Sequence, residues 1–152
     1  MVKENTKVSE ISVSYRPAVA NKPIVISSLD AYVLFKQFFD ESTINLQETF
    51  MVMYLNRMNR VLGIYPMSKG GITGTVVDIR LIFSVALTIA STSIILAHNH
   101  PSENMKSSKG DIDVTNRIKE GGKLLDIQLL DHLIISPVDR EYYSFADAGI
   151  LA

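Results

Sequence analysis

The spacing of apolar residues along the chain changes repeatedly, and each spacing predicts a type of element. Alternation of apolar and polar residues favours a half-buried strand, and a short uninterrupted apolar run favours a buried one. Apolar residues three and four positions apart favour a helix. On these patterns we predict strands over the ranges 8–15, 48–55, 60–67, 93–98 and 126–136. We predict helices over the ranges 28–40, 79–91 and 108–122.

Polar residues at the ends of these segments support the predicted boundaries. A helix N-cap is expected at the pair Ser27–Ser28, at Asp78 and at Ser108. Asn56–Asn59 is typical of a turn between two strands. The glycine-rich stretch 69–74 lacks the lysine–serine ending of a phosphate-binding loop and is better interpreted as a bend in the sheet. We expect the C-terminal tail to cover a sheet edge.

Alternation of strands and helices without a repeat or linker predicts a single α/β domain. We place that domain at residues 24–152 and expect residues 1–23 to form an N-terminal extension containing the first strand. At 152 residues the chain is long enough for one substantial core.

Composition narrows the classes of function. The net charge of −1 provides no basic surface for binding phosphate backbones, so charge alone argues against nucleic acid as a partner. The chain has no cysteine, which excludes disulfides and a thiolate zinc site and is compatible with a cytoplasmic location. The N-terminus lacks the apolar core of a signal peptide.

One uncharged run, Leu81–Ala97, has nearly the length of a membrane span. It contains several serines and threonines and leads directly into a histidine-rich stretch, so we interpret it as a buried helix followed by a buried strand. We therefore expect no membrane association.

The densest chemistry follows that strand, in Leu96–Asp111. His98 and His100 lie two residues apart at its end and would point to the same face, so both imidazoles can bind one cation. Asp111, in the first turn of the next helix, is a candidate third ligand. Two histidines and an aspartate with a fourth position open are typical of a catalytic zinc site. Two metal-free alternatives stay open: structural histidines, and a capping box between Ser108 and Asp111 that is compatible with either interpretation.

The spacing His98-x-His100, seven residues, Ser108, two residues, Asp111 reproduces the signature of the JAMM (JAB1/MPN) metalloproteases. More narrowly, the chain resembles the RadC family, whose historical label is DNA repair. Four motifs carry this resemblance in the same order: ILAHNHPS, the serine–aspartate pair, LLDHLIIS and YYSFADAG. The resemblance implies one MPN domain of the cytidine deaminase-like type, with a curved mixed sheet flanked by helices. It also implies that the helix-hairpin-helix region of longer RadC proteins has no counterpart here, so a DNA role based on that region does not transfer.

The resemblance further implies a zinc-dependent hydrolase of peptide or isopeptide bonds. His98, His100 and Asp111 would be the zinc ligands, and Ser108 would orient the reacting water or stabilise the oxyanion. The family's general base is an upstream glutamate, which corresponds to Glu48 more closely than to Glu41. The substrate would be a peptide or protein of unknown identity, and a homo-oligomer is compatible with the sequence.

Other positions raise more local questions. Asp131 and His132 interrupt an apolar strand, and one of them would either orient a metal-binding histidine or make a structural hydrogen bond. Where the family usually has glycine after HNHPS this chain has Glu103, so a turn with positive φ there would be strained. Ser107 stands where the family usually has proline, which loosens the loop.

Two rival functions remain at this stage: a non-catalytic MPN binding module, and a DNA-repair-associated accessory protein. The letters HNH alone do not indicate the nuclease of that name, whose residues are dispersed. A zinc nucleobase deaminase is excluded because its P-C-x-x-C motif is absent.

Overall fold

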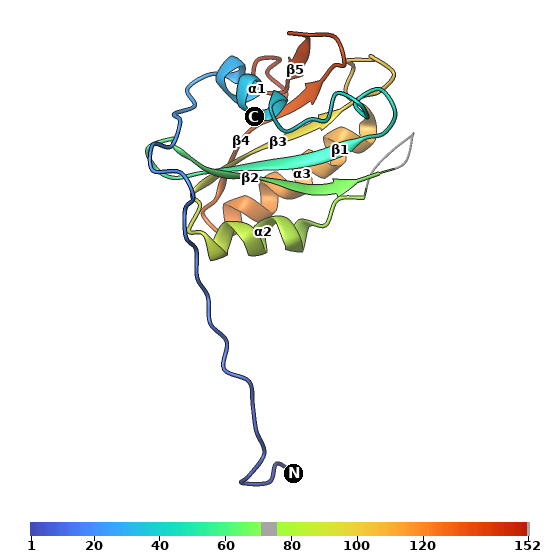
Figure 1. The fold of residues 1–152 in the computed structure, drawn as a ribbon. Coiled ribbons are helices and arrows are strands. Elements are labelled where there is room, and N and C mark those ends of the chain that lie inside the picture. The colour runs from blue at the N-terminus through green and yellow to red at the C-terminus, as the bar shows by residue number, and fades with distance from the viewer. Residues whose placement is uncertain (71–75, 152) are drawn as a thin grey trace.

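Five strands and three helices form one domain in the computed structural model, which describes residues 1–70 and 76–151. The strands are β1 (Thr49–Leu55), β2 (Val61–Lys69), β3 (Ser93–Asn99), β4 (Gln128–Ile135) and β5 (Tyr142–Ser144). The helices are α1 (Ser28–Lys36), α2 (Ile79–Thr88) and α3 (Lys109–Leu124). The strands make a single sheet in the order β2-β1-β3-β4-β5 (Figure 1). The predicted α/β class is confirmed.

The sheet is mixed. Strand β1 pairs antiparallel with both β2 and β3, β3 pairs parallel with β4, and β4 pairs antiparallel with β5. Every residue of β1 and β3 is buried, as expected for central strands covered on both faces. The tail does complete the sheet, because β5 forms its edge beside β4.

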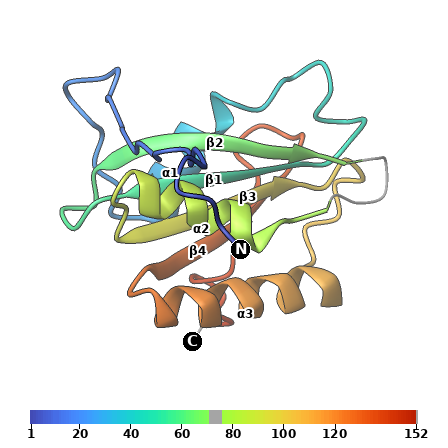
Figure 2. The same ribbon diagram turned by 90° about the horizontal axis from the view of Figure 1, so that it is seen from below.

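Helices cover both faces of the sheet. One core lies between the sheet and α1, and it takes Met53, Ile95 and Leu133 from three neighbouring strands. The other lies between the sheet and the pair α2 and α3, which run along the same face (Figure 2). Ile94 and Leu96 of β3 belong to this second core, so strand alternation sends His98 to the same side.

Two helices end earlier than predicted, and a left-handed residue accounts for one of these ends. The helix expected to reach residue 91 ends at Thr88, because Ala90 adopts a left-handed conformation with φ of 56°. The amide of Ser91 then donates to Ala86 O, which closes the helix end. The helix expected to reach residue 40 ends at Lys36, and the turn that follows still buries Phe39.

Helix α3 instead passes beyond the predicted end at Gly121 and Gly122. These glycines serve close packing: a Cβ on Gly122 would collide with the backbone oxygen of Ile127. The helix ends at Leu124, and left-handed Asp126, with φ of 55°, turns the chain into β4. Glycines one turn inside the helix were thus mistaken for its terminus.

The predicted first strand is absent. Residues 8–15 pair with no strand, and the described N-terminal segment runs away from the domain as an extended chain (Figure 1). Val8, Ile11 and Val13 are 87%, 86% and 69% exposed, and the Tyr15 hydroxyl donates to Leu62 O of β2. Alternation of apolar and polar residues identifies a segment that could form a strand, but the segment must also pair with the edge of a sheet.

The uncharged run that resembled a membrane span is divided between α2 and β3. Among the described residues no helix is both long enough and apolar enough to cross a membrane. The predicted glycine-rich bend lies largely outside the described residues, since β2 continues to Lys69 and the description resumes at residue 76.

Candidate metal centre

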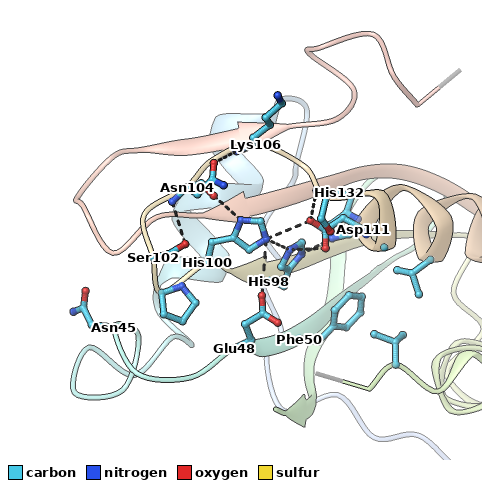
Figure 3. A pocket seen from close by; sticks show the side chains of 15 residues that line it. Asn45, Glu48, Phe50, His98, His100, Ser102, Asn104, Lys106, Asp111 and His132 are labelled. Atoms are coloured by element: carbon cyan, nitrogen blue, oxygen red, sulfur yellow. Dashed lines mark hydrogen bonds and ion pairs between the residues drawn. The ribbon is translucent and has the colours of Figure 1, made fainter. Parts of the chain in front are cut away.

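The two histidines of the H-x-H motif meet at the carboxyl end of β3. His98 is the second-last residue of β3, and His100 is the first residue after the strand. The Nε2 atoms of the two rings are 2.9 Å apart. His98 is 3% exposed. Both rings face the same cavity, as Figure 3 shows. The expected convergence of the imidazoles is therefore present.

Asp111 approaches the histidines from the first turn of α3. Its Oδ1 atom is 3.3 Å from His98 Nε2, and its Oδ2 atom is 3.3 Å from His100 Nε2. A capping box holds it in place: the Asp111 amide donates to Ser108 Oγ at 3.0 Å, and the Ser108 amide donates to Asp111 Oδ2 at 2.9 Å. The same carboxylate caps the helix and contacts the histidines, so the capping box and a metal-binding role of Asp111 are compatible.

Glu48 reaches the site from the residue before β1. Its Oε1 atom is 3.9 Å from His100 Nε2, and one ligand atom each of Glu48, His98 and His100 lie within 4.8 Å of one another. Glu41 is exposed and does not line the cavity. The structure thus brings together all five residues singled out from the sequence and leaves the alternative glutamate outside.

A buried asparagine between the histidines fixes the segment that carries Glu48. The Asn99 side chain accepts from the Thr49 amide at 2.7 Å and donates to the carbonyls of Ile44 and Gln47, each at 2.9 Å. Asn99 is fully buried, and its bonds flank Glu48 on both sides. The sequence patterns did not single out Asn99, although its place inside the H-x-H motif was a signal.

The cavity around these groups measures about 720 Å³. Polar side chains from the loop after β3 and apolar side chains from β1 and α3 form its walls. Besides the residues already described, the lining contains Asn45, Phe50, Val77, Pro101, Ser102, Asn104, Lys106, Gly110, Val114 and His132.

The carboxylate of Asp111 and the ring of His100 shift one another's proton affinity. Burial of the Asp111 carboxyl opposes its ionisation, but the interactions with His100 and His98 outweigh burial and hold the pKa of Asp111 well below its usual range. The bond to Asp111 in turn raises the pKa of His100, against the opposing effect of burial. Without a metal, the site is a network of coupled charges.

The loop after His100 sets the orientation of that ring. His100 Nδ1 is 2.5 Å from the backbone oxygen of Asn104, and a carbonyl can only accept, so Nδ1 carries the proton and Nε2 is the nitrogen available to a ligand. Glu103 completes this turn by donating its amide to His100 O, with φ of 64°. The positive φ expected at this position is confirmed, and here a glutamate adopts it.

The structure separates the roles of Asp131 and His132. Asp131 Oδ2 accepts from Ser144 Oγ, and its Oδ1 accepts from the amides of Ala146 and His132. It therefore ties β4 to the C-terminal segment, and burial raises the pKa of its carboxyl. The adjacent His132 points to the opposite face and lies 2.7 Å from His98 Nδ1 through its Nε2 atom. Burial, followed by the nearby His98, lowers the pKa of His132 well below its usual value.

The donor set fits a tetrahedral divalent metal. Ligand atoms bound to zinc at 2.0–2.1 Å in a tetrahedron lie about 3.3 Å from one another, and both histidine-to-Asp111 separations are 3.3 Å. The histidine-to-histidine separation of 2.9 Å is somewhat shorter. Imidazole nitrogens with one carboxylate are ligands that zinc and other transition metals accept.

Comparison with known families agrees with this geometry. Residues 25–150 match the model of the RadC-like JAB domain family. The chain belongs to that family. In this structure the matched residues include the five strands, the three helices and the candidate metal ligands.

Curated relatives of this RadC-like domain include several UPF0758 proteins. A UPF0758 protein of Flavobacterium johnsoniae is 43% identical over 126 residues, which cover 83% of this chain and 53% of the relative. One from Desulfitobacterium hafniense is 40% identical over 140 residues, 92% of this chain and 59% of the relative. One from Methanosarcina acetivorans is 38% identical over 127 residues, 84% of this chain and 53% of the relative.

The RadC-like chain spans about half the length of the curated relatives it matches. Their names state no activity. Family membership and a group of side chains that can hold a metal are therefore the findings from which a function must be argued.

Proposed function

We propose that this RadC-like domain is a zinc-dependent hydrolase of amide bonds, acting on a peptide or isopeptide. The observation that carries the proposal is the convergence of His98 Nε2, His100 Nε2 and the Asp111 carboxylate at tetrahedral spacing, with a further carboxylate, Glu48, beside His100. Of the two carboxylates, Asp111 lies closer to the histidines, so we assign it as the third ligand. Glu48 is then available as the general base.

The residues around this site would divide the work as follows. A bound zinc ion supplies Lewis acidity and lowers the pKa of a water molecule towards about 7. Glu48 would accept a proton from the water that attacks the substrate carbonyl and would then deliver this proton to the leaving amine. Ser108 accepts a hydrogen bond through Oγ from the Asp111 amide, so its own hydroxyl proton can be donated to the oxygen that gains negative charge.

Replacement of Glu48 tests the proposal. The zinc-loaded full chain and its Glu48→Gln variant are incubated with a library of peptides and lysine-linked isopeptides, and new amino termini are counted by mass spectrometry. We expect cleavage by the wild type and a loss of about a hundredfold or more in the variant, with zinc binding retained. Glu41→Gln is the matched control and should cleave like the wild type.

Equal activity in the Glu48→Gln variant, or no cleavage by the zinc-loaded wild type, would contradict a catalytic role. A wild type that binds zinc without cleaving any substrate would favour the non-catalytic MPN module instead.

A cytoplasmic location and a protein substrate belong to the same proposal. The cysteine-free composition supports the location, and the open cavity in front of the histidines supports the substrate.

A further inference from the structure

Hydrogen bonds behind His98 form a continuous path from the backbone of α3 to the metal centre. Thr115 Oγ1 is 2.6 Å from Asp111 O and 2.6 Å from His132 Nδ1, and His132 Nε2 is 2.7 Å from His98 Nδ1. We propose that Thr115 and His132 are positioning residues that fix His98 in the tautomer whose Nε2 atom carries a free lone pair. This inference rests on the proposed metal site, which that nitrogen faces.

The donor and acceptor of each hydrogen bond follow from the Asp111 carbonyl at the start of the path. The Asp111 carbonyl can only accept, so Thr115 donates its single hydroxyl proton to this oxygen. Thr115 Oγ1 can then only accept from the His132 ring, which places a proton on His132 Nδ1. This assignment depends on donor and acceptor chemistry alone, since one hydroxyl cannot donate to two partners at once.

The surroundings of His132 determine the next bond. The residue is completely buried, with the Phe145 ring stacked on it at 4.7 Å and the Phe50 ring edge-on at 5.9 Å. A cationic ring there would lack a carboxylate partner, and burying an unpaired charge is costly. His132 is therefore neutral, its Nε2 accepts from His98 Nδ1, and the lone pair of His98 is left on Nε2.

The path also joins two of the proposed ligands. One end is the backbone oxygen of Asp111, and the other end is His98 Nε2, which lies 3.3 Å from the Asp111 carboxylate. Helix α3 thus supplies one ligand directly and sets the proton on another through Thr115 and His132. The proton on His100 Nδ1 is held separately, by the carbonyl of Asn104.

The tautomers of the metal-free wild type provide the first test. Long-range proton–nitrogen correlation spectra of the full chain, labelled with nitrogen-15 at histidine, distinguish a proton on Nδ1 from one on Nε2. With the three signals assigned by single replacements, we expect His98 and His132 both to carry the proton on Nδ1. A His98 ring protonated on Nε2 in the neutral state would overturn the proposal.

Zinc affinity provides the second test, by competition with a chromophoric chelator. Thr115→Val removes the hydroxyl with little change in shape, and we expect zinc affinity to fall about tenfold to a hundredfold. Thr115→Ser keeps the hydroxyl and should restore affinity. Thr88→Val is the matched control, because Thr88 likewise donates to the carbonyl four residues earlier, Ser84 O, on α2.

A folded Thr115→Val variant with wild-type zinc affinity would overturn the positioning role, as would an equal loss in Thr88→Val. Circular dichroism establishes folding, and a variant that fails to fold leaves the spectra of the wild type to decide. If the wild type binds no zinc, the proposed function fails, whereas the tautomer assignment is still judged on the metal-free protein.

Discussion

At the scale of single residues, the metal centre depends on side chains whose neighbours restrict what they can do. Asn99 has every polar group of its side chain bonded to the segment around Glu48. His100 is restricted by a carbonyl on one side and a carboxylate on the other. These restraints reduce the reorganisation that metal binding requires, because the ligand atoms already face one another.

The raised pKa of His100 predicts that zinc binding weakens in acid. A histidine binds metal only when neutral, and the bond to Asp111 extends protonation of His100 to a higher pH than usual. Asp111, with its lowered pKa, stays ionised and adds no dependence near neutrality. We expect the apparent zinc affinity to fall by up to about tenfold per pH unit as the pH is lowered from neutrality to about 6, since the raised pKa of His100 lies above the usual 6.5.

Calorimetry in buffers of different ionisation enthalpy measures this effect and the proton that zinc displaces. Proton release should increase as the pH is lowered towards about 6. An affinity that is constant over this range, with no proton released, would contradict the coupling between His100 and Asp111.

The left-handed conformation of Glu103 predicts a strained loop. A residue with a Cβ pays about 1–2 kcal/mol in this region, whereas glycine does not. Glycine also gains freedom in the unfolded chain, which offsets part of the benefit. We expect Glu103→Gly to be more stable than Glu103→Ala by about 0.5–1 kcal/mol in urea unfolding. Alanine removes the charge equally, so an alanine variant that is as stable as the glycine variant would contradict the strain.

At the scale of elements, the patterns predicted where strands and helices form better than where they end. The buried runs at β1 and β3 and the caps at Asp78 and Ser108 lie as expected. The ends of α2 and α3 depend on left-handed conformations at Ala90 and Asp126, which residues with side chains adopt only when tertiary packing stabilises them. No local pattern contains that information.

The same limit applied to the metal centre. Spacing placed His98, His100, Ser108 and Asp111 together because a strand and a helix start have fixed geometry. Spacing alone left Asp131 and His132 as alternatives, since the choice depends on which face of β4 each residue occupies. Thr115 carried no motif, although its position one turn after Asp111 placed it on the same side of α3.

The capping box of α3 predicts a link between helix stability and metal binding. Ser108→Ala removes the acceptor for the Asp111 amide and should destabilise the domain by about 1 kcal/mol. Because Asp111 then loses part of its fixed position, zinc affinity should fall as well. Chemical unfolding and chelator competition measure the two effects.

The matched control for that cap is Asp78→Ala. Asp78 caps α2 by accepting from the amides of Arg80 and Leu81, and it lies outside the metal centre. Its loss should lower stability by a similar amount and leave zinc affinity unchanged. An equal drop in zinc affinity in both variants would show that general destabilisation, and not the position of Asp111, is responsible.

At the scale of the whole molecule, the net charge argues against DNA as the ligand of this chain. A net charge of −1 offers little counterion release. We expect fluorescence anisotropy to show binding to duplex DNA weaker than about 100 µM at physiological salt, with a shallow salt dependence. Micromolar binding that weakens steeply with salt would contradict this expectation and favour the DNA-repair alternative.

The most direct test of the whole account is a crystal structure of the zinc-soaked chain with anomalous diffraction recorded at the zinc edge. We predict one strong peak about 2.0–2.1 Å from Nε2 of His98, Nε2 of His100 and a carboxylate oxygen of Asp111, with Glu48 outside the coordination shell. A peak that Glu48 coordinates in place of Asp111, or no peak at the histidines, would contradict it.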